Sequence, residues 1–139
     1  NIAQAMFELA DLQPGQTVLD IGCGDGSILF VAAKKFKAKG IGIDKNPSLI
    51  MLGKVRAKLL GVADKVKLQT GNAFTTKMPQ TDLITCYLFP EFQEKLEPRL
   101  LEAYPSGTKV VTHAFKYPNL KLVKTAQINK TWVYLYQVP

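Results

Sequence analysis

A short apolar run that ends in a glycine-rich bend is the feature that most constrains this fold. Residues 18–21 (VLDI) have strand character, and residues 22–26 (GCGDG) follow at once. Glycines at alternate positions allow the backbone to turn sharply and to approach a ligand closely. A helical pattern begins at Ser27, so the helix would offer its N-terminal amides to the same place. The sequence therefore predicts a strand–loop–helix unit that carries a ligand site.

Helical and strand-like patterns alternate along the chain. Apolar spacing predicts helices over residues 2–9, 27–36, 47–60 and 91–104, the last with a break near Pro98. It predicts strands over residues 17–21, 40–43, 65–69, 82–88, 108–113, 120–128 and 131–137. This alternation favours a parallel sheet with right-handed crossovers, closed by an antiparallel hairpin around Asn129-Lys130. Ligands bind such sheets beyond the carboxyl ends of the strands.

The length of the chain fits one domain, and we interpret residues 1–139 as a single domain. The chain begins at Asn1 rather than Met, inside a helical pattern, which is compatible with a shortened N-terminus. Cys23 and Cys86 have no metal-ligand spacing, so we expect free thiols and no metal. No apolar run approaches the roughly 20 residues that cross a bilayer. We expect a monomer in the cytoplasm, although a lost N-terminal segment could carry an anchor.

The chain has a formal net charge of +7, which favours contact with polyanions or with acidic protein patches. Four lysines cluster between residues 34 and 39, while the others are scattered. Solvated surface positions explain a scattered distribution equally well. Nucleic acid is therefore a possible partner but not the favoured one.

The charges at the bend indicate which cofactor it binds. The pattern G-x-G-x-x-G of a dinucleotide loop is not met, and Asp20 and Asp25 would repel a pyrophosphate. Both carboxylates suit a cationic ligand, and S-adenosylmethionine carries an ammonium and a sulfonium group. The sequence therefore favours S-adenosylmethionine, with S-adenosylhomocysteine as product, over NAD.

Two further loops support this cofactor. Asp44 ends the next strand, where a carboxylate can accept hydrogen bonds from both ribose hydroxyls. Asn72 follows the third strand and can accept from the adenine amino group, with Phe74 against the ring. Each feature has a simpler explanation, because glycines and Asn72 form turns and Asp44 can cap the helix after it. Three such features at successive strand ends favour the cofactor.

These motifs resemble those of class I methyltransferases. VLDIGCGDG is similar to their first motif, GIDKNP (residues 42–47) to the second, and GNAF (residues 71–74) to the adenine-side loop. Residues 82–91 (DLITCYLFPE), 96–100, 105–115 and 133–136 resemble one group within that class. This group is the small protein-lysine methyltransferase family of archaea and mitochondria, whose mitochondrial members modify the c-ring protein of ATP synthase and the adenine nucleotide translocase.

The resemblance implies an S-adenosylmethionine-dependent enzyme that methylates a lysine of a protein substrate. With the alternation of elements, it predicts an α/β fold: a doubly wound, Rossmann-like mixed seven-stranded sheet of order 3-2-1-4-5-7-6 with a C-terminal antiparallel β-hairpin. The chain departs from the family at Ser27, where Arg is common, at Asn72, where Asp is common, and at Ala114, where an acid is usual. The Tyr/Pro-containing segment that precedes the first helix in the family is absent.

The predicted site has three parts. The expected cofactor-binding residues are Asp20, Gly22, Cys23, Gly24, Gly26, Asp44, Lys45, Asn72, Ala73, Phe74 and Tyr87. The expected substrate mouth is Leu88, Phe89, Pro90 and Glu91. Tyr87 and His113 are the candidate catalytic residues, because a methyl acceptor needs a free lone pair and a lysine amine must first lose its proton. Tyr87 can equally be a core residue, His113 can equally be satisfied by backbone groups, and Glu91 can equally favour a helix dipole.

Two other functions stay open. The first is an RNA, DNA or small-molecule methyltransferase on the same fold, which the positive charge favours. The absence of an N-P-P-Y-like tetrapeptide after the fourth strand speaks against methylation of an exocyclic base amine. The second is a non-catalytic module that binds S-adenosylmethionine, although such a module has no physical need of Asp20, Asp44 and the glycines.

Overall fold

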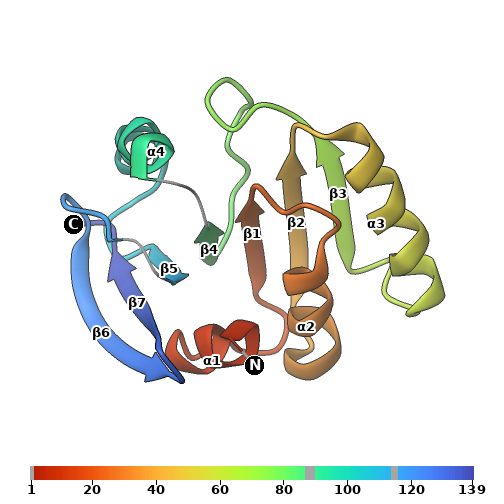
Figure 1. Ribbon diagram of the computed structural model, residues 1–139, viewed down its shortest axis with the longest axis horizontal. Helices are drawn as coiled ribbons and strands as arrows, with labels where there is room; N and C mark the ends of the chain where they lie inside the picture. The colour runs from red at the N-terminus through yellow and green to blue at the C-terminus, as the bar shows by residue number, and fades with distance from the viewer. Residues whose placement is uncertain (1, 87–89, 114–115) are drawn as a thin grey trace.

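The strands of the chain form one mixed sheet in a computed structural model that describes residues 2–86, 90–113 and 116–139 (Figure 1). Within these residues the strand order is β3-β2-β1-β4-β5-β7-β6, which confirms the predicted order. The first five strands run parallel, and β7 lies antiparallel to both β5 and β6. The strands are β1 (Thr17–Ile21), β2 (Lys39–Asp44), β3 (Val66–Thr70), β4 (Leu83–Cys86), β5 (Lys109–His113), β6 (Lys121–Ile128) and β7 (Thr131–Gln137).

Helices cover both faces of the sheet. They are α1 (Ile2–Leu9), α2 (Ser27–Phe36), α3 (Pro47–Leu59) and α4 (Pro90–Ala103). The helices α1, α2 and α3 pack on one face, where Phe7, Leu29 and Ile50 belong to the same apolar core as the strand residues Val18 and Val111. The sheet is therefore doubly wound, since α4 packs on the opposite face.

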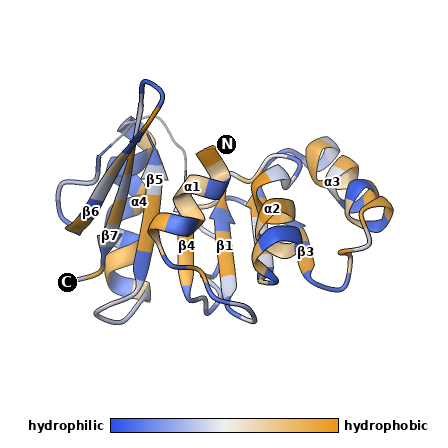
Figure 2. Cartoon of the chain, turned by 90° about the horizontal axis from the view of Figure 1, so that it is seen from below, coloured by the Kyte–Doolittle hydropathy of each residue, from blue (hydrophilic) through white to orange (hydrophobic). Residues whose placement is uncertain are grey.

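The second apolar core joins α4 to the other sheet face. Leu96 and Leu100 of α4 lie against Leu19, Ile84 and Tyr136, and all of these side chains are almost completely buried. Figure 2 shows the apolar strands between the helices, with α3 at one end of the molecule and the hairpin of β6 and β7 at the other. In the described ranges, no helix has both the length and the apolar character needed to cross a membrane.

The C-terminal hairpin forms where the sequence predicts it. Asn129 occupies a left-handed conformation with φ of 56°, which a short hairpin turn requires and which Asn tolerates well. The strand β7 inserts between β5 and β6, so its residues Val133 and Leu135 are buried while β6 is mostly exposed. Cys23 and Cys86 are both free and buried, as expected.

The predicted break near Pro98 is wrong, because α4 runs without interruption from Pro90 to Ala103. Proline removes one backbone donor and bends a helix, but Leu96 and Leu100 are fully buried on either side and hold the axis in place. The first helical residue is Pro90 rather than Glu91, which agrees with the preference for proline in the first turn.

Glu97 is a buried carboxylate that connects α4 to the chain before β6. It is 2% exposed. Its oxygens accept from the Asn119 backbone at 2.8 Å, the Asn119 side chain at 2.8 Å and the Leu120 backbone at 3.1 Å. Hydrogen bonds to a charged group are stronger than neutral ones, and these three fix the chain reversal that leads into β6.

We predict that Glu97→Ala lowers the free energy of unfolding by about 3 kcal/mol, because it leaves buried donors unsatisfied and opens a cavity beside Leu96. The matched control, Glu94→Ala, changes an exposed residue of the same helix and is expected to cost less than about 0.5 kcal/mol. Urea unfolding followed by circular dichroism measures both. Equal losses in the two variants would contradict a structural role for the Glu97 hydrogen bonds.

Candidate cofactor and methyl-transfer site

The loop after β1 is held against the end of β2 by backbone hydrogen bonds. Gly22, Gly24 and Gly26 have φ values of 75°, 58° and 86°, a region that other residues rarely adopt. The N–H groups of Gly22 and Cys23 both donate to the carbonyl of Ile43, at 2.8 and 3.1 Å. The backbone thus passes across the carboxyl edge of the sheet with few side chains in the way.

Asp44 ties this loop to the turn that follows β2. One carboxylate oxygen accepts from the Gly24 N–H at 2.8 Å and the other accepts from the Asn46 N–H at 2.8 Å. The cap of α3 is Asn46, whose side chain accepts from the Ser48 and Leu49 N–H groups. A carboxylate has about four acceptor sites, so Asp44 keeps capacity for the hydroxyls of a ligand.

Asp20 is a buried carboxylate beneath the same loop. It is 3% exposed, and Thr85 of β4 donates to it at 2.8 Å. Burial raises the pKa of Asp20 to about 7; the hydrogen bond from Thr85 lowers it, and the negative charge of Asp44 raises it further. The described residues bring no cationic side chain to Asp20. Its ionised form therefore gains most from a cation that arrives from outside.

The electrostatic field in the loop is negative. Burial raises the pKa of the Cys23 thiol to about 12, and the charges of Asp20, Asp44 and Asp25 add to this effect. Asp25 stays ionised but is paired with Arg56: burial opposes its ionisation, and hydrogen bonds from Ser27 and the Arg56 guanidinium outweigh burial and lower the pKa of Asp25. The attraction for a cationic ligand thus comes from Asp20 and Asp44.

The adenine-side loop is closed by its own backbone and by α4. The Asn72 side-chain oxygen accepts from the Phe74 N–H at 2.8 Å, so the turn-forming role is present and one acceptor position on that oxygen is used. Phe74 stacks on Phe92 of α4, with ring centroids 6.1 Å apart. The Arg99 guanidinium donates to the carbonyls of Ala73 and Thr76.

The other predicted site residues differ in how far they are exposed to solvent. Lys45 is exposed just beyond Asp44, and Pro90 and Glu91 are exposed at the start of α4. His113 ends β5 at the same carboxyl edge, half-buried, and burial lowers the pKa of its imidazole. The predicted residues Tyr87, Leu88 and Phe89 lie outside the described residues.

Three residues with clear roles at this edge were not predicted. Thr85 bonds Asp20, Arg56 pairs with Asp25 and lies over the Phe30 ring at 5.3 Å, and Arg99 clamps the adenine-side loop. Each acts across more than 20 residues of sequence. The departure from the family pattern at Ser27 lies next to one of them, because Arg56 of α3 donates a hydrogen bond to the Ser27 hydroxyl at 3.2 Å.

The residues at this edge fit S-adenosylmethionine. A buried carboxylate with no cationic partner suits an ammonium group, the Asp44 carboxylate suits a ribose diol, and a loop backed by Phe74 suits an adenine ring. No group of His, Cys, Asp and Glu side chains that could hold a metal occurs in the described part of the chain.

Comparison with known proteins agrees with this geometry. Residues 20–124 match the ANTKMT methyltransferase domain. A protein-lysine N-methyltransferase of Saccharolobus islandicus is 30% identical over 99% of this chain and 89% of its own length. A mouse lysine N-methyltransferase, named for the C protein of ATP synthase, is 28% identical over 84% of this chain, which spans about half (48%) of the mouse protein.

A solved structure is similar over almost the whole chain. The RNA methyltransferase from Salinibacter ruber, crystallised with S-adenosyl-L-homocysteine, has 34% identity and a TM-score of 0.94. The alignment covers 99% of this chain and 90% of that one. The match to the domain family spans most of the chain, including the glycine loop, Asp44 and α4. The chain therefore belongs to the ANTKMT methyltransferase domain family and is an S-adenosylmethionine-dependent methyltransferase with a Rossmann-like fold.

Proposed function

We propose that this enzyme is a protein-lysine N-methyltransferase. The observation that carries the proposal is the match, along 99% of the chain, to a protein named for that activity. The similarity to a second lysine methyltransferase, over 84% of the chain, supports it. Both alignments are long enough to include α4 and β5, in the half of the sheet where an acceptor would approach, and not only the cofactor loops.

We assign the cofactor to the loops after β1, β2 and β3. Asp20 faces the ammonium group, the backbone of Gly22, Cys23, Gly24 and Gly26 borders the amino-acid portion, and Asp44 takes the ribose hydroxyls. Lys45, Asn72, Ala73 and Phe74 line the adenine end, and Tyr87 belongs to the predicted set without a described position. The buried carboxylate and the hydrogen bond between Gly24 and Asp44 support this arrangement.

The remaining residues serve the acceptor. Bound S-adenosylmethionine supplies a methyl group activated by a sulfonium. A target lysine must lose a proton first, at a cost of about 4 kcal/mol at neutral pH. Half-buried His113 is a candidate acceptor for that proton: burial lowers the pKa of its imidazole, which keeps it neutral at pH 7 but also makes it a weaker base. Tyr87 is its alternative, and Leu88, Phe89, Pro90 and Glu91 form the proposed entrance.

RNA is the second candidate acceptor. The Salinibacter protein of 34% identity is named an RNA methyltransferase, and the net charge of +7 would attract a polyanion. A nucleic-acid substrate would make activity fall steeply with added salt, because phosphate contacts release counterions. A lysine on a small protein region would give a weaker dependence on salt.

Asp20 makes cofactor binding depend on pH in a predictable direction. Its pKa of about 7 in the free protein means that protonation competes with an ammonium ligand below that pH. We predict that the affinity for S-adenosylmethionine falls as pH drops below about 7, by up to about tenfold per pH unit, with release of a proton on binding. Calorimetric titration in buffers of different ionisation heat measures both quantities.

Asp20→Asn should remove this pH dependence and weaken binding at pH 8, while the control Asp64→Asn, at an exposed position, should do neither.

The raised pKa of Asp20 also makes the stability of the free protein depend on pH. It adds stability below about pH 4, and this contribution is lost as pH rises through about 7. The Asp20→Asn variant should not lose stability between about pH 4 and pH 7 in this way, and the melting temperature as a function of pH measures the difference. An affinity that stays constant across this range in the unmodified protein would contradict the assignment of Asp20.

The acceptor is tested by transfer of labelled methyl groups to a cell extract. We predict label that protease removes, that nuclease leaves, and that acid hydrolysis releases as methyl-lysine. Asp44→Ala should lower transfer at least about 100-fold, because it loosens the glycine loop as well as removing the ribose acceptor. The exposed Asp64→Ala is the matched control. Label that nuclease removes would transfer the assignment to RNA or DNA.

A further inference from the structure

The helix α3 presents apolar residues to solvent. Four residues form what we name the α3 ridge: Met51, Leu52, Val55 and Leu59, which are 62%, 49%, 49% and 82% exposed. The opposite face of the helix packs on the sheet through Ile50, Gly53 and Ala57. A surface helix normally exposes polar residues and buries its apolar ones, whereas α3 has apolar residues on its exposed side as well as on its buried side.

The α3 ridge is continuous rather than scattered. Met51, Val55 and Leu59 follow one another at four-residue intervals, so their side chains are neighbours along one line of the helix, and Leu52 lies beside them. Single exposed apolar residues need no explanation, but a contiguous stripe marks an interaction surface. From Met51 to Leu59 this stripe extends about 12 Å along the helix axis.

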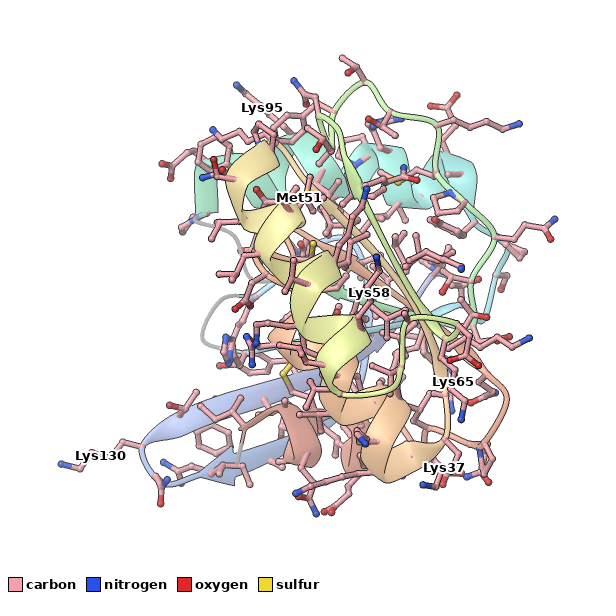
Figure 3. All side chains as sticks on the ribbon, turned by 90° about the vertical axis from the view of Figure 1, so that its right-hand side faces the viewer. Lys37, Met51, Lys58, Lys65, Lys95 and Lys130 are labelled. Carbon is pink, nitrogen blue, oxygen red and sulfur yellow. The ribbon has the colours of Figure 1, made fainter. Side chains whose placement is uncertain are left out.

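Lysines border this stripe. Residues 45–63 contain no acidic residue, and Lys45, Lys54 and Lys58 are all exposed. Arg56 belongs to the same helix but is engaged with Asp25. Figure 3 looks onto α3 and shows Met51 and Lys58 on it, with Lys65 beyond its C-terminal end and Lys37 at the end of α2. The charged residues that α3 itself carries are therefore all basic, and the first acidic residue after the helix is the exposed Asp64.

We propose that the α3 ridge and its bordering lysines dock onto an anionic lipid bilayer, with the helix lying along the surface. Apolar side chains would enter the acyl boundary while the lysines extend to the headgroups. The positive border is complementary to anionic lipid, whereas a second copy of the chain would bring the same lysines together. A protein partner is less well matched, because the ridge has no aromatic residue and lies on the outermost helix of the molecule (Figures 1 and 2).

This inference does not depend on the identity of the acceptor. It has a geometric consequence, because α3 begins directly after the Asp44–Asn46 turn. Docking through α3 would bring the cofactor edge of the sheet close to the bilayer. The acceptors then within reach are those held at a membrane surface.

Vesicle flotation tests the proposal. The full chain is mixed with vesicles of phosphatidylcholine alone and of phosphatidylcholine and phosphatidylglycerol in equal parts. We expect flotation with the anionic vesicles and little with the neutral ones. The double variant Met51→Gln, Leu59→Gln should reduce partitioning at least about tenfold, and Lys54→Gln, Lys58→Gln about fivefold for each lysine removed.

Matched controls come from β6 at the other end of the molecule. Leu122→Gln, Val123→Gln changes two residues that are 50% and 40% exposed, and Lys121→Gln, Lys124→Gln removes two exposed lysines. Neither should alter flotation, and thermal unfolding should be unchanged in all four variants. Absence of flotation in the unmodified protein would overturn the proposal, as would equal losses for α3 and β6 variants. A dimer in sedimentation that Met51→Gln, Leu59→Gln dissociates would assign the ridge to self-association instead.

Discussion

The hydrogen bond from the Gly24 N–H to the Asp44 carboxylate holds the cofactor edge together. A loop with three left-handed glycines has a large conformational entropy to lose, and the glycines have no side chains that could hold it. The Asp44 carboxylate and the Ile43 carbonyl supply fixed acceptors for three of its N–H groups. The same carboxylate receives the Asn46 N–H, so one side chain sets both the loop after β1 and the start of α3.

The two kinds of carboxylate at this edge behave differently. Asp25 is paired with Arg56 and bonded by Ser27, so its charge serves to join α2 to α3. Asp20 accepts a hydrogen bond from the Thr85 hydroxyl and has no cationic partner among the described residues, and burial raises its pKa. Keeping such a group charged lowers the stability of the free protein, and a cationic ligand restores that stability when it binds. With Asp20 facing the ammonium group, as we propose, its electrostatic penalty in the free protein becomes part of the affinity for the cofactor.

Sequence patterns predicted most of the fold because its determinants are local. The alternation of apolar segments, the glycine bend and the Asn129 turn each depend on a few consecutive residues, and the elements begin at or next to the residues expected. The predicted break at Pro98 failed because propensity was overridden by the burial of Leu96 and Leu100. Arg56, Arg99 and Glu97 could not be predicted, because each bonds to partners that only the fold brings near.

The two halves of the sheet are held together in different ways, which bears on why relatives of similar sequence are named for different methyl acceptors. The strands β1, β2 and β3 hold the cofactor loops through backbone contacts and Asp44, which depend little on the acceptor. The half of the sheet that we propose for the acceptor is held by side chains: Tyr117 contacts the Cys86 sulfur at the end of β4, Glu97 holds the chain before β6, and Arg99 donates to the adenine-side loop. Relatives named for protein lysine and for RNA are similar along nearly all of this chain. Since fold alone does not fix a substrate, we expect the choice of acceptor to depend on side chains outside the cofactor loops, including α4 and the proposed docking surface of α3.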